Sequence, residues 1–160
     1  DDSGMGDPAG LALAEALGRS STLMSFELKA APQMGDVTFE ALAAAVASHT
    51  ALRSFACDAR ETRMSDGGGV AIARALEQNS TLQSVTFVAS YTRVGDSTGL
   101  ALAESIKTNT TLRSIKFRAY EAEMDDHIID AVDAAIEQSV VRNADLHAQR
   151  QELRQLAGWD

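Results

Sequence analysis

The side chains of this protein that could do chemistry are few and lie far apart in the sequence. His49, His127 and His147 occur in different segments and show no spacing typical of a metal site, so we interpret them as solvated surface residues. Cys57 is the single cysteine, which excludes an intramolecular disulfide framework and fits a reducing compartment. It falls at an apolar position of a predicted strand, where a thiol acts as a small hydrophobic group. We therefore expect no catalytic residue, no metal site, no cofactor and no small-molecule substrate.

One glycine-rich run, from Asp66 to Gly69, opens a predicted helix, and a helix start of this kind can hold an anion. However, Gly10 and Gly99 occupy the same column of other predicted helices without a glycine-rich loop before them. We therefore interpret the run as part of a structural pattern and not as a phosphate-binding loop.

The elements that must position all these residues repeat along the chain. Aspartates recur at spacings of 29, 30, 30 and 30 residues, at Asp7, Asp36, Asp66, Asp96 and Asp126. An apolar residue follows ten positions after every aspartate, and a leucine follows sixteen positions after each of the first four. Columns in register over the length of the chain indicate a repeat protein.

Each unit changes its hydrophobic period in the middle. In the third unit, apolar residues first fall on one stripe of a helix, at Val70, Ile72, Ala73 and Leu76. The aspartate before each such stripe is predicted to be the N-cap of the helix. A polar turn follows, and the apolar residues then alternate with a period of two, which predicts a strand, at Leu82, Val85 and Phe87.

This unit resembles the leucine-rich repeat of the ribonuclease-inhibitor type, whose strand signature is L-x-x-L-x-L. The resemblance covers residues 5 to about 139. It implies an α/β solenoid in a right-handed horseshoe arc, with a parallel sheet on the concave side and helices on the convex side. We expect a single domain over residues 1–160, with about four and a half repeats whose units start near residues 5, 34, 64, 94 and 124.

The pattern departs from that family in the ascending loops, which lead from each strand to the next helix. The usual repeat carries Asn or Cys eight residues after the first strand leucine. This sequence has Ala31, Arg60, Ser90 and Tyr120 there. The asparagine ladder is missing at this column, so the loops must satisfy their backbone groups in another way.

The last unit is atypical, as the end of a solenoid must be. Arg142 stands where the strand leucine belongs, and residues 143–157 predict a further amphipathic helix with Leu146, Leu153 and Leu156 on one face. We interpret 143–157 as a C-terminal capping helix over the exposed edge of the stack.

Charge and hydropathy exclude several classes of partner. The 160 residues carry a formal net charge of -9, which argues against nucleic acid. No run approaches the roughly 18–20 apolar residues that a membrane span needs, and the first residues do not resemble a signal peptide. We expect an intracellular, cytoplasmic location.

The variable strand positions and the ascending loops are the predicted binding surface. Segments 23–33, 52–63, 82–93 and 112–123 hold eight of the fourteen basic residues and five acidic ones. Arginine and tyrosine are enriched at interface hot spots. We predict a protein partner with an acidic patch, bound by Arg53, Tyr91, Arg93, Arg113, Lys116, Arg118 and Tyr120. The alternative is a structural subunit held in a larger assembly by its helical face or its N-terminal edge.

A closer resemblance concerns the fourth unit and the tail, from Asn109-Thr110-Thr111-Leu112 through Asn143-Ala144-Asp145-Leu146. These segments resemble the C-terminal repeat domain of tropomodulins and leiomodins. That resemblance implies binding to actin filaments, which is a second alternative function.

Overall fold

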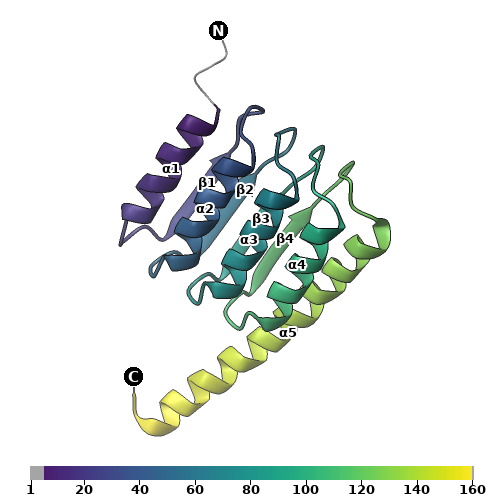
Figure 1. The fold of residues 1–160 in the computed structure, drawn as a ribbon. Coiled ribbons are helices and arrows are strands. Elements are labelled where there is room, and N and C mark those ends of the chain that lie inside the picture. Colours follow the sequence, from purple (N-terminus) through teal and green to yellow (C-terminus); the bar gives the residue numbers. More distant parts are fainter. Residues whose placement is uncertain (1–5, 160) are drawn as a thin grey trace.

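The computed structural model describes residues 6–159, which form a row of alternating helices and strands. The elements are α1 (Asp7–Arg19), β1 (Ser25–Lys29), α2 (Asp36–Ser48), β2 (Ser54–Asp58), α3 (Asp66–Gln78), β3 (Ser84–Val88), α4 (Asp96–Thr108), β4 (Ser114–Arg118) and α5 (Asp126–Ala157). The four strands form one parallel sheet in the order β1-β2-β3-β4. Helices α1 to α4 lie side by side along one face of this sheet (Figure 1).

The register of the sheet places equivalent residues of successive units next to each other. Ser25 pairs with Ser54, Ser54 with Ser84, and Ser84 with Ser114. Every column of the sequence repeat is thus a column in space. The fold is a leucine-rich-repeat α/β solenoid with an open sheet, which confirms the predicted fold class.

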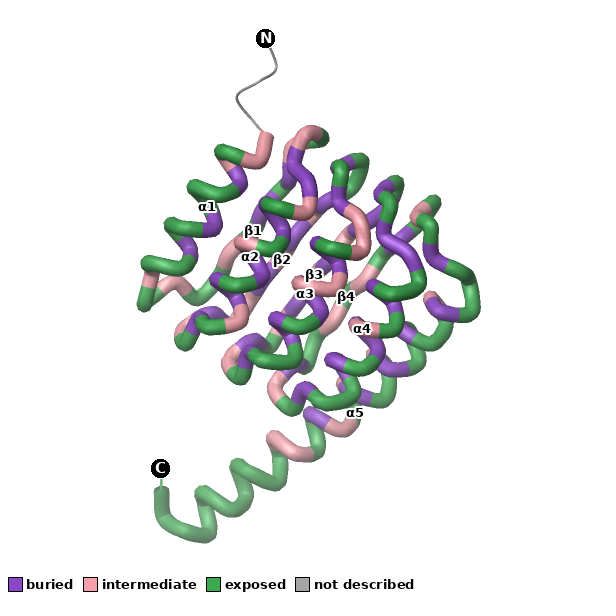
Figure 2. Tube along the Cα trace, in the orientation of Figure 1, coloured by how far each residue is buried: buried purple, intermediate pink, exposed green. Residues whose placement is uncertain are grey.

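The core lies between the sheet and the helices and is made of these columns (Figure 2). The leucines that begin the strand pattern in the interior units, Leu52, Leu82 and Leu112, are all 0% exposed. The inward strand positions Phe55 and Phe87 are buried beside them. Burying a side chain of this size stabilises the fold by about 1.5–3 kcal/mol. Each stacked column of buried apolar residues therefore contributes several such terms to the stability of the fold.

Glycines allow the helices to approach one another. A Cβ atom added to Gly10 would lie 2.2 Å from Thr38 Oγ1, and one added to Gly69 would lie 2.3 Å from Thr98 Oγ1. A glycine of one unit therefore receives a threonine of the next unit. This packing confirms that the run from Asp66 to Gly69 belongs to a structural pattern.

The repeated aspartates do not cap their own helices, and that prediction is wrong for all five of them. Each repeated aspartate is the first helical residue. In α1 to α4 the N-cap position before it makes no side-chain capping bond, and in α5 the cap is Asp125 and not Asp126. The first four aspartates instead accept hydrogen bonds from the next unit. Asp36 accepts from the backbone N–H groups of Ser65 (2.8 Å) and Gly68 (3.0 Å), which begin α3. A helix start leaves such N–H groups without a partner inside its own helix, and stacking brings the neighbouring carboxylate to them.

This aspartate ladder lowers the pKa of two of its carboxyl groups, those of Asp36 and Asp7. Burial raises the pKa of the Asp36 carboxyl, but the hydrogen bonds from Ser65 and Gly68 outweigh burial and hold the pKa below its ordinary value. For Asp7, the leading cause of a lowered pKa is the hydrogen bond from the Gly35 backbone, followed by the Thr38 hydroxyl. The ionised carboxylates therefore join one unit to the next.

A second ladder holds the descending turns, which lead from each helix to the next strand. The Asn79 side chain is buried, and its Nδ2 donates to the carbonyl oxygens of Val46 (2.8 Å) and His49 (3.2 Å). Its Oδ1 accepts from the N–H groups of Thr81 and Leu82, both at 2.8 Å. Asn109 repeats this arrangement one unit later. The asparagines missing from the ascending loops thus have counterparts in the turns at the opposite ends of the strands.

His49 occupies the asparagine position of the second unit. Its side chain is buried, with Nδ1 accepting from the N–H groups of Ala51 (3.2 Å) and Leu52 (3.0 Å). The prediction of a solvated surface residue is wrong for His49, because its ring nitrogen replaces the asparagine oxygen in closing the turn.

The predicted separate capping helix at 143–157 is also not present. Residues Asp126–Ala157 form one continuous helix, because no glycine or proline interrupts it before the left-handed Gly158. The first half packs on α4 through buried Val132 and Ala135. In the second half Leu153 and Leu156 are 65% and 79% exposed, and this half extends beyond the stack (Figures 1 and 2).

Polar side chains of α5 bind the free carbonyl groups at the C-terminal end of α4 and in the turn that follows it. The Arg142 guanidinium donates to the carbonyl oxygens of Lys107 and Asn109, and Asn143 donates to those of Asn109 (3.1 Å) and Leu112 (2.7 Å). Arg142 therefore does not disrupt a strand. It satisfies the free carbonyl groups at the end of the last regular helix.

Candidate functional site

The predicted partner-binding residues separate into two groups at opposite ends of the strands. Arg118, Tyr91 and Tyr120 line a hollow at the ascending loops, which we call the ascending-loop hollow. Arg53 and Arg113 line a different pocket at the descending turns, which we call the turn pocket. A strand rises about 3.3 Å per residue, so the five residues from Arg113 to Arg118 separate the two ends by roughly 16 Å. The single patch expected from Arg113, Lys116 and Arg118 is therefore split.

The ascending-loop hollow is built around an exposed aromatic pair. Tyr91 and Tyr120 meet edge to face with ring centroids 5.7 Å apart, and their exposed fractions are 53% and 65%. The hollow has a volume of about 560 Å³, and Arg60, Phe117 and Arg118 also line it, together with the acidic side chain of Asp133 from α5. An edge-to-face pair prefers this geometry because a positive ring edge meets a negative ring face. The rings present a large apolar area with guanidinium groups beside it.

The loops that carry this pair are held firmly. The N–H of Tyr91 donates to the carbonyl oxygen of Tyr120 at 2.9 Å, so adjacent loops are joined through their backbones. Tyr91 has a positive φ of 57°, but Glu61 and Glu121 occupy the same column with φ of 58° and 51°. The left-handed residue is therefore a structural feature of the three longer loops, and it fixes the direction of the tyrosine without being specific to it.

An ion pair lies at the rim of the same hollow. The Arg60 Nε donates to Asp58 Oδ1 at 2.9 Å. Burial raises the pKa of the Asp58 carboxyl, but its hydrogen bonds with Arg60 outweigh this effect and lower the pKa overall. A partly exposed pair of this kind contributes little to stability. Arg118 lies at the same rim, and among the described residues no carboxylate forms an ion pair with it.

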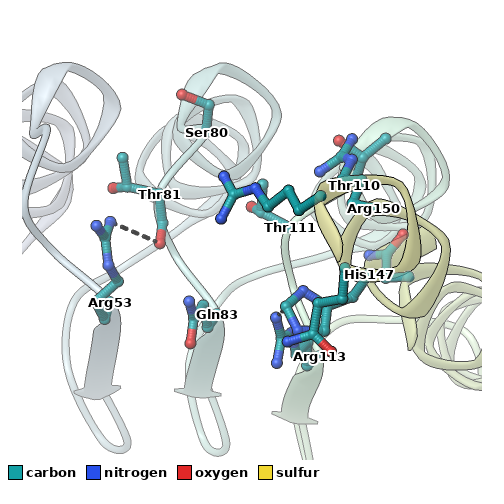
Figure 3. A pocket seen from close by; sticks show the side chains of 12 residues that line it. Arg53, Ser80, Thr81, Gln83, Thr110, Thr111, Arg113, His147 and Arg150 are labelled. Atoms are coloured by element: carbon teal, nitrogen blue, oxygen red, sulfur yellow. Dashed lines mark hydrogen bonds between the residues drawn. The ribbon is translucent and has the colours of Figure 1, made fainter. Parts of the chain in front are cut away.

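The turn pocket combines residues from three units with the exposed half of α5 (Figure 3). It has a volume of about 350 Å³ and five basic side chains, which are Arg53, Arg113, His147, Arg150 and Arg154. The turns add the hydroxyl groups of Ser80, Thr81, Thr110 and Thr111. Arg53 approaches the Thr81 carbonyl oxygen at 3.3 Å, while Arg150 extends toward the same turn from α5 (Figure 3).

The contact between Arg113 and His147 connects α5 to the residue immediately before β4. A guanidinium has no acceptor, so the contact between Arg113 Nη2 and His147 Nδ1 requires the imidazole nitrogen to accept. His147 is therefore oriented by Arg113, which lies 34 positions earlier in the chain and immediately precedes β4.

The remaining predicted residues belong to neither hollow. Lys116 is exposed in the middle of β4, between the two sites. Arg93 lies three residues before α4 and forms an isolated β-bridge with Ser65, the residue that precedes α3. Its charge contributes to the lowered pKa of Asp36. Arg93 lines neither hollow, so the structure does not bring it together with Arg113, and its place in a binding surface stays a prediction.

Sequence reasoning missed His147, Arg150 and Arg154 as site residues. These positions have spacings of three and four, which places them on one face of a helix. This periodicity is the signal by which the basic stripe can be found, whereas the leucines of the same segment predict an edge cap.

Other reactive groups do not gather at either site. Cys57 is buried in β2, where burial first and the nearby Asp58 carboxylate second raise the pKa of its thiol to about 12. Within residues 6–159, no three His, Cys, Asp or Glu side chains are arranged to hold a metal ion. The helices of this part of the chain include none with the length and apolar character of a membrane span.

Comparisons with known proteins support the fold. No protein-family model matches the chain, and no curated protein matches it in sequence. Among solved structures, actin-binding site 2 of leiomodin-1 is similar, with a TM-score of 0.64 and 16% identity over 94% of this chain and 96% of that one. A tropomodulin C-terminal domain from Caenorhabditis elegans aligns with a TM-score of 0.46 and 13% identity, over 94% of this chain and 98% of that one. The leiomodin likeness is one of fold.

Proposed function

We propose that this protein is a recognition module that binds an acidic segment of a partner protein at the ascending-loop hollow. The observation that carries the proposal is the exposed Tyr91–Tyr120 pair beside the Arg118 guanidinium, on loops joined by backbone hydrogen bonds. Tyrosine and arginine in a rigid setting are typical of interface hot spots. Because the loops are already ordered, little conformational entropy is lost when a partner binds.

The charge distribution favours an acidic partner. The whole chain carries a net charge of -9, while β4 presents Lys116 and Arg118 on its exposed face. An acidic partner would be repelled by most of the surface and attracted at this strand, which orients the encounter. Association should therefore weaken as the salt concentration rises.

The double variant Arg118→Glu with Tyr120→Ala tests this proposal. Proteins retained by the immobilised wild-type chain would be identified by mass spectrometry, and their affinities would then be measured with purified components. We expect the double variant to weaken the specific complex by at least about 30-fold, the size of one hot spot. Both substituted side chains are exposed, so the melting temperature should not change.

Arg74→Glu is the matched control, because Arg74 is exposed on helix α3, on the opposite side of the molecule. It should leave the complex intact. If Arg74→Glu abolishes binding and the double variant does not, the helical face is the interface. The structural-subunit function would then replace this proposal.

The likeness to leiomodin-1 favours actin filaments as a second candidate partner. Co-sedimentation with filamentous actin would test it directly. We expect the wild-type chain to pellet with filaments and the Arg118→Glu, Tyr120→Ala variant to remain in the supernatant. A wild-type chain that stays in the supernatant would exclude this candidate and leave recognition of another acidic partner open to the first test.

A further inference from the structure

We propose that the turn pocket is a phosphomonoester site that takes the phosphate group of a phosphorylated side chain in a partner protein. The site lies at the end of the strands opposite the ascending-loop hollow, and it does not depend on the function proposed for that hollow. The basic side chains that define it come from β-strand starts and from α5, residues up to 101 positions apart (Arg53 to Arg154).

The first argument is that the basic side chains of this pocket have no acidic side chain beside them. The chain has 23 acidic and 14 basic residues, yet no Asp or Glu lines this pocket. Among residues 6–159, Arg53, Arg113, Arg150 and Arg154 form no ion pair with a carboxylate. Four guanidinium groups facing one cavity of about 350 Å³ repel one another. A bound anion would relieve this repulsion, and a dianion would do so more than a monoanion.

The second argument is the arrangement of donors. Arg53 lies on one side of the pocket and Arg150 on the other, with Arg113 and His147 at a third position (Figure 3). A carboxylate has two oxygens in one plane, which suit a single guanidinium fork. A phosphate group has three terminal oxygens that point in different directions. Donors on several sides of one cavity therefore match the phosphate better.

The third argument is a rigid floor. Asn79 and Asn109 are 3% and 4% exposed, and each bonds two carbonyl groups of the preceding unit and two N–H groups of its own turn. These bonds hold the turns that carry Thr81 and Thr111. The pocket floor is thus ordered before any ligand arrives, and such preorganisation strengthens binding.

The geometry also explains why α5 continues past the stack. Its exposed half contributes nothing to the core, since Leu153 and Leu156 remain largely exposed. It does bring Arg150 and Arg154 over the descending turns, to the same cavity as Arg53. The extension therefore completes the basic pocket from a side that the repeats themselves cannot provide.

The test uses the 160-residue chain labelled with ¹⁵N, which is titrated with the tripeptide Gly-phosphoserine-Gly and followed by NMR. Signals of Thr81, Thr110, Thr111 and His147 should shift and saturate. Gly-Ser-Gly should produce no shift, and Gly-Glu-Gly should bind at least about tenfold more weakly, since a carboxylate forms fewer charge-assisted hydrogen bonds. Inorganic phosphate, as a third probe, should bind more weakly than the phosphopeptide.

Two variants locate the site. Arg113→Gln with Arg150→Gln should weaken phosphopeptide binding by at least about tenfold, through the loss of charge-assisted hydrogen bonds. The control Arg74→Gln on α3 should bind as wild type. The variant Arg118→Glu with Tyr120→Ala should also bind the phosphopeptide as wild type, so that failure at one site is distinguished from failure at the other.

Several results would overturn the inference. They are equal binding of Gly-Glu-Gly and the phosphopeptide, no saturable shifts, or unchanged affinity in the Arg113→Gln, Arg150→Gln variant. Inorganic phosphate binding as tightly as the phosphopeptide would mean that the site serves a free anion. Binding only to vesicles of phosphatidylcholine with phosphatidylinositol 4-phosphate would assign the pocket to a membrane surface instead.

Discussion

The interior units and the long helix α5 differ in how they use their side chains. In the units around β2 and β3, the inward-facing columns contain apolar residues in both units, and the strand leucines Leu52 and Leu82 are fully buried. In α5 the columns are interrupted by charged and polar residues, and the helix ends in turns that are exposed throughout. The comparison shows that regular columns provide stability. Residues outside these columns are available for binding. The three basic residues of α5 at the turn pocket belong to no column.

The same contrast appears in the hydrogen-bond ladders. Asp66, between interior units, accepts hydrogen bonds from the N–H groups of Gly95 and Thr98 and from the Thr98 hydroxyl. Asp96, at the junction with α5, accepts a single bond, from the N–H of Asp125. There Asp125 caps α5 itself by accepting from the His127 N–H. The ladder thus weakens as the repeat ends, and the last helix begins with a cap of its own.

The largest expected effect comes from removing a core leucine of an interior unit. We predict that Leu82→Ala and Leu112→Ala each lower the free energy of unfolding by about 2–5 kcal/mol, through lost burial and the cavity left behind. Chemical denaturation would measure this. Leu153→Ala in α5 is the matched control, and it should change stability by less than about 0.5 kcal/mol because that side chain is 65% exposed. Equal effects at Leu82 and Leu153 would contradict the division into a stabilising interior and a projecting helix.

The next effect concerns the aspartate ladder. We predict that Asp36→Asn lowers the free energy of unfolding by about 1–3 kcal/mol at neutral pH, because a charged acceptor of hydrogen bonds from Ser65 and Gly68 is lost. Asp96→Asn should have a smaller effect, because one exposed bond depends on it. Urea denaturation of both variants beside the wild type would compare the interior with the end.

The pH dependence of the Asp36 contribution follows from its lowered pKa. The folded state holds the proton less tightly than the unfolded chain, whose aspartates titrate near about 3.9. The stabilisation is therefore complete above that value and is lost as the pH falls through the lower folded pKa. The difference in stability between wild type and Asp36→Asn should shrink over the same acidic range. A difference that stays constant down to pH 2 would show that the carboxylate charge is not involved.

The smallest effect on stability is expected from shortening α5. A chain that ends at residue 147 lacks only exposed helix, so its melting temperature should stay close to that of the full chain, while phosphopeptide binding is lost with Arg150 and Arg154. A chain that ends at residue 142 also lacks the buried Asn143 and its bonds to Asn109 and Leu112. We expect that shorter chain to melt at a clearly lower temperature. Equal melting of the two truncated chains would show that Asn143 does not secure the end of the stack.

Much of the repeat could be predicted from the sequence because its signals are local and recur. The apolar stripe after Asp66 and the alternation from Leu82 to Phe87 each lie within one element, and the period of about 30 residues brings equivalent elements together. The inward position of Cys57 followed from the same alternation, and the structure confirms that it is buried.

The partners of the polar residues could not be predicted in this way. An aspartate before an apolar stripe is an ordinary N-cap signal, and nothing near Asp36 in the sequence indicates that Ser65 and Gly68 will donate to it. His49 looks like a surface residue until the Asn79 column places it in a turn. For Asp36 a contact with the next repeat replaces the local cap, because stacking brings the free N–H groups of the next helix to the carboxylate. His49 forms its hydrogen bonds within its own turn, and its burial becomes evident only once the units are stacked.

The sequence by itself thus determined the class of fold, the period, the core columns and the types of residue available for binding, because hydrophobic periodicity specifies burial within each element. Tertiary structure alone decided that Arg113 and Arg118 lie at separate sites and that Arg53 shares a pocket with Arg150, 97 positions later in the chain. The direction of α5 is the physical reason. Its exposed half is not directed by an apolar face, so its path is set where Arg142, Asn143 and His147 contact α4 and the start of β4.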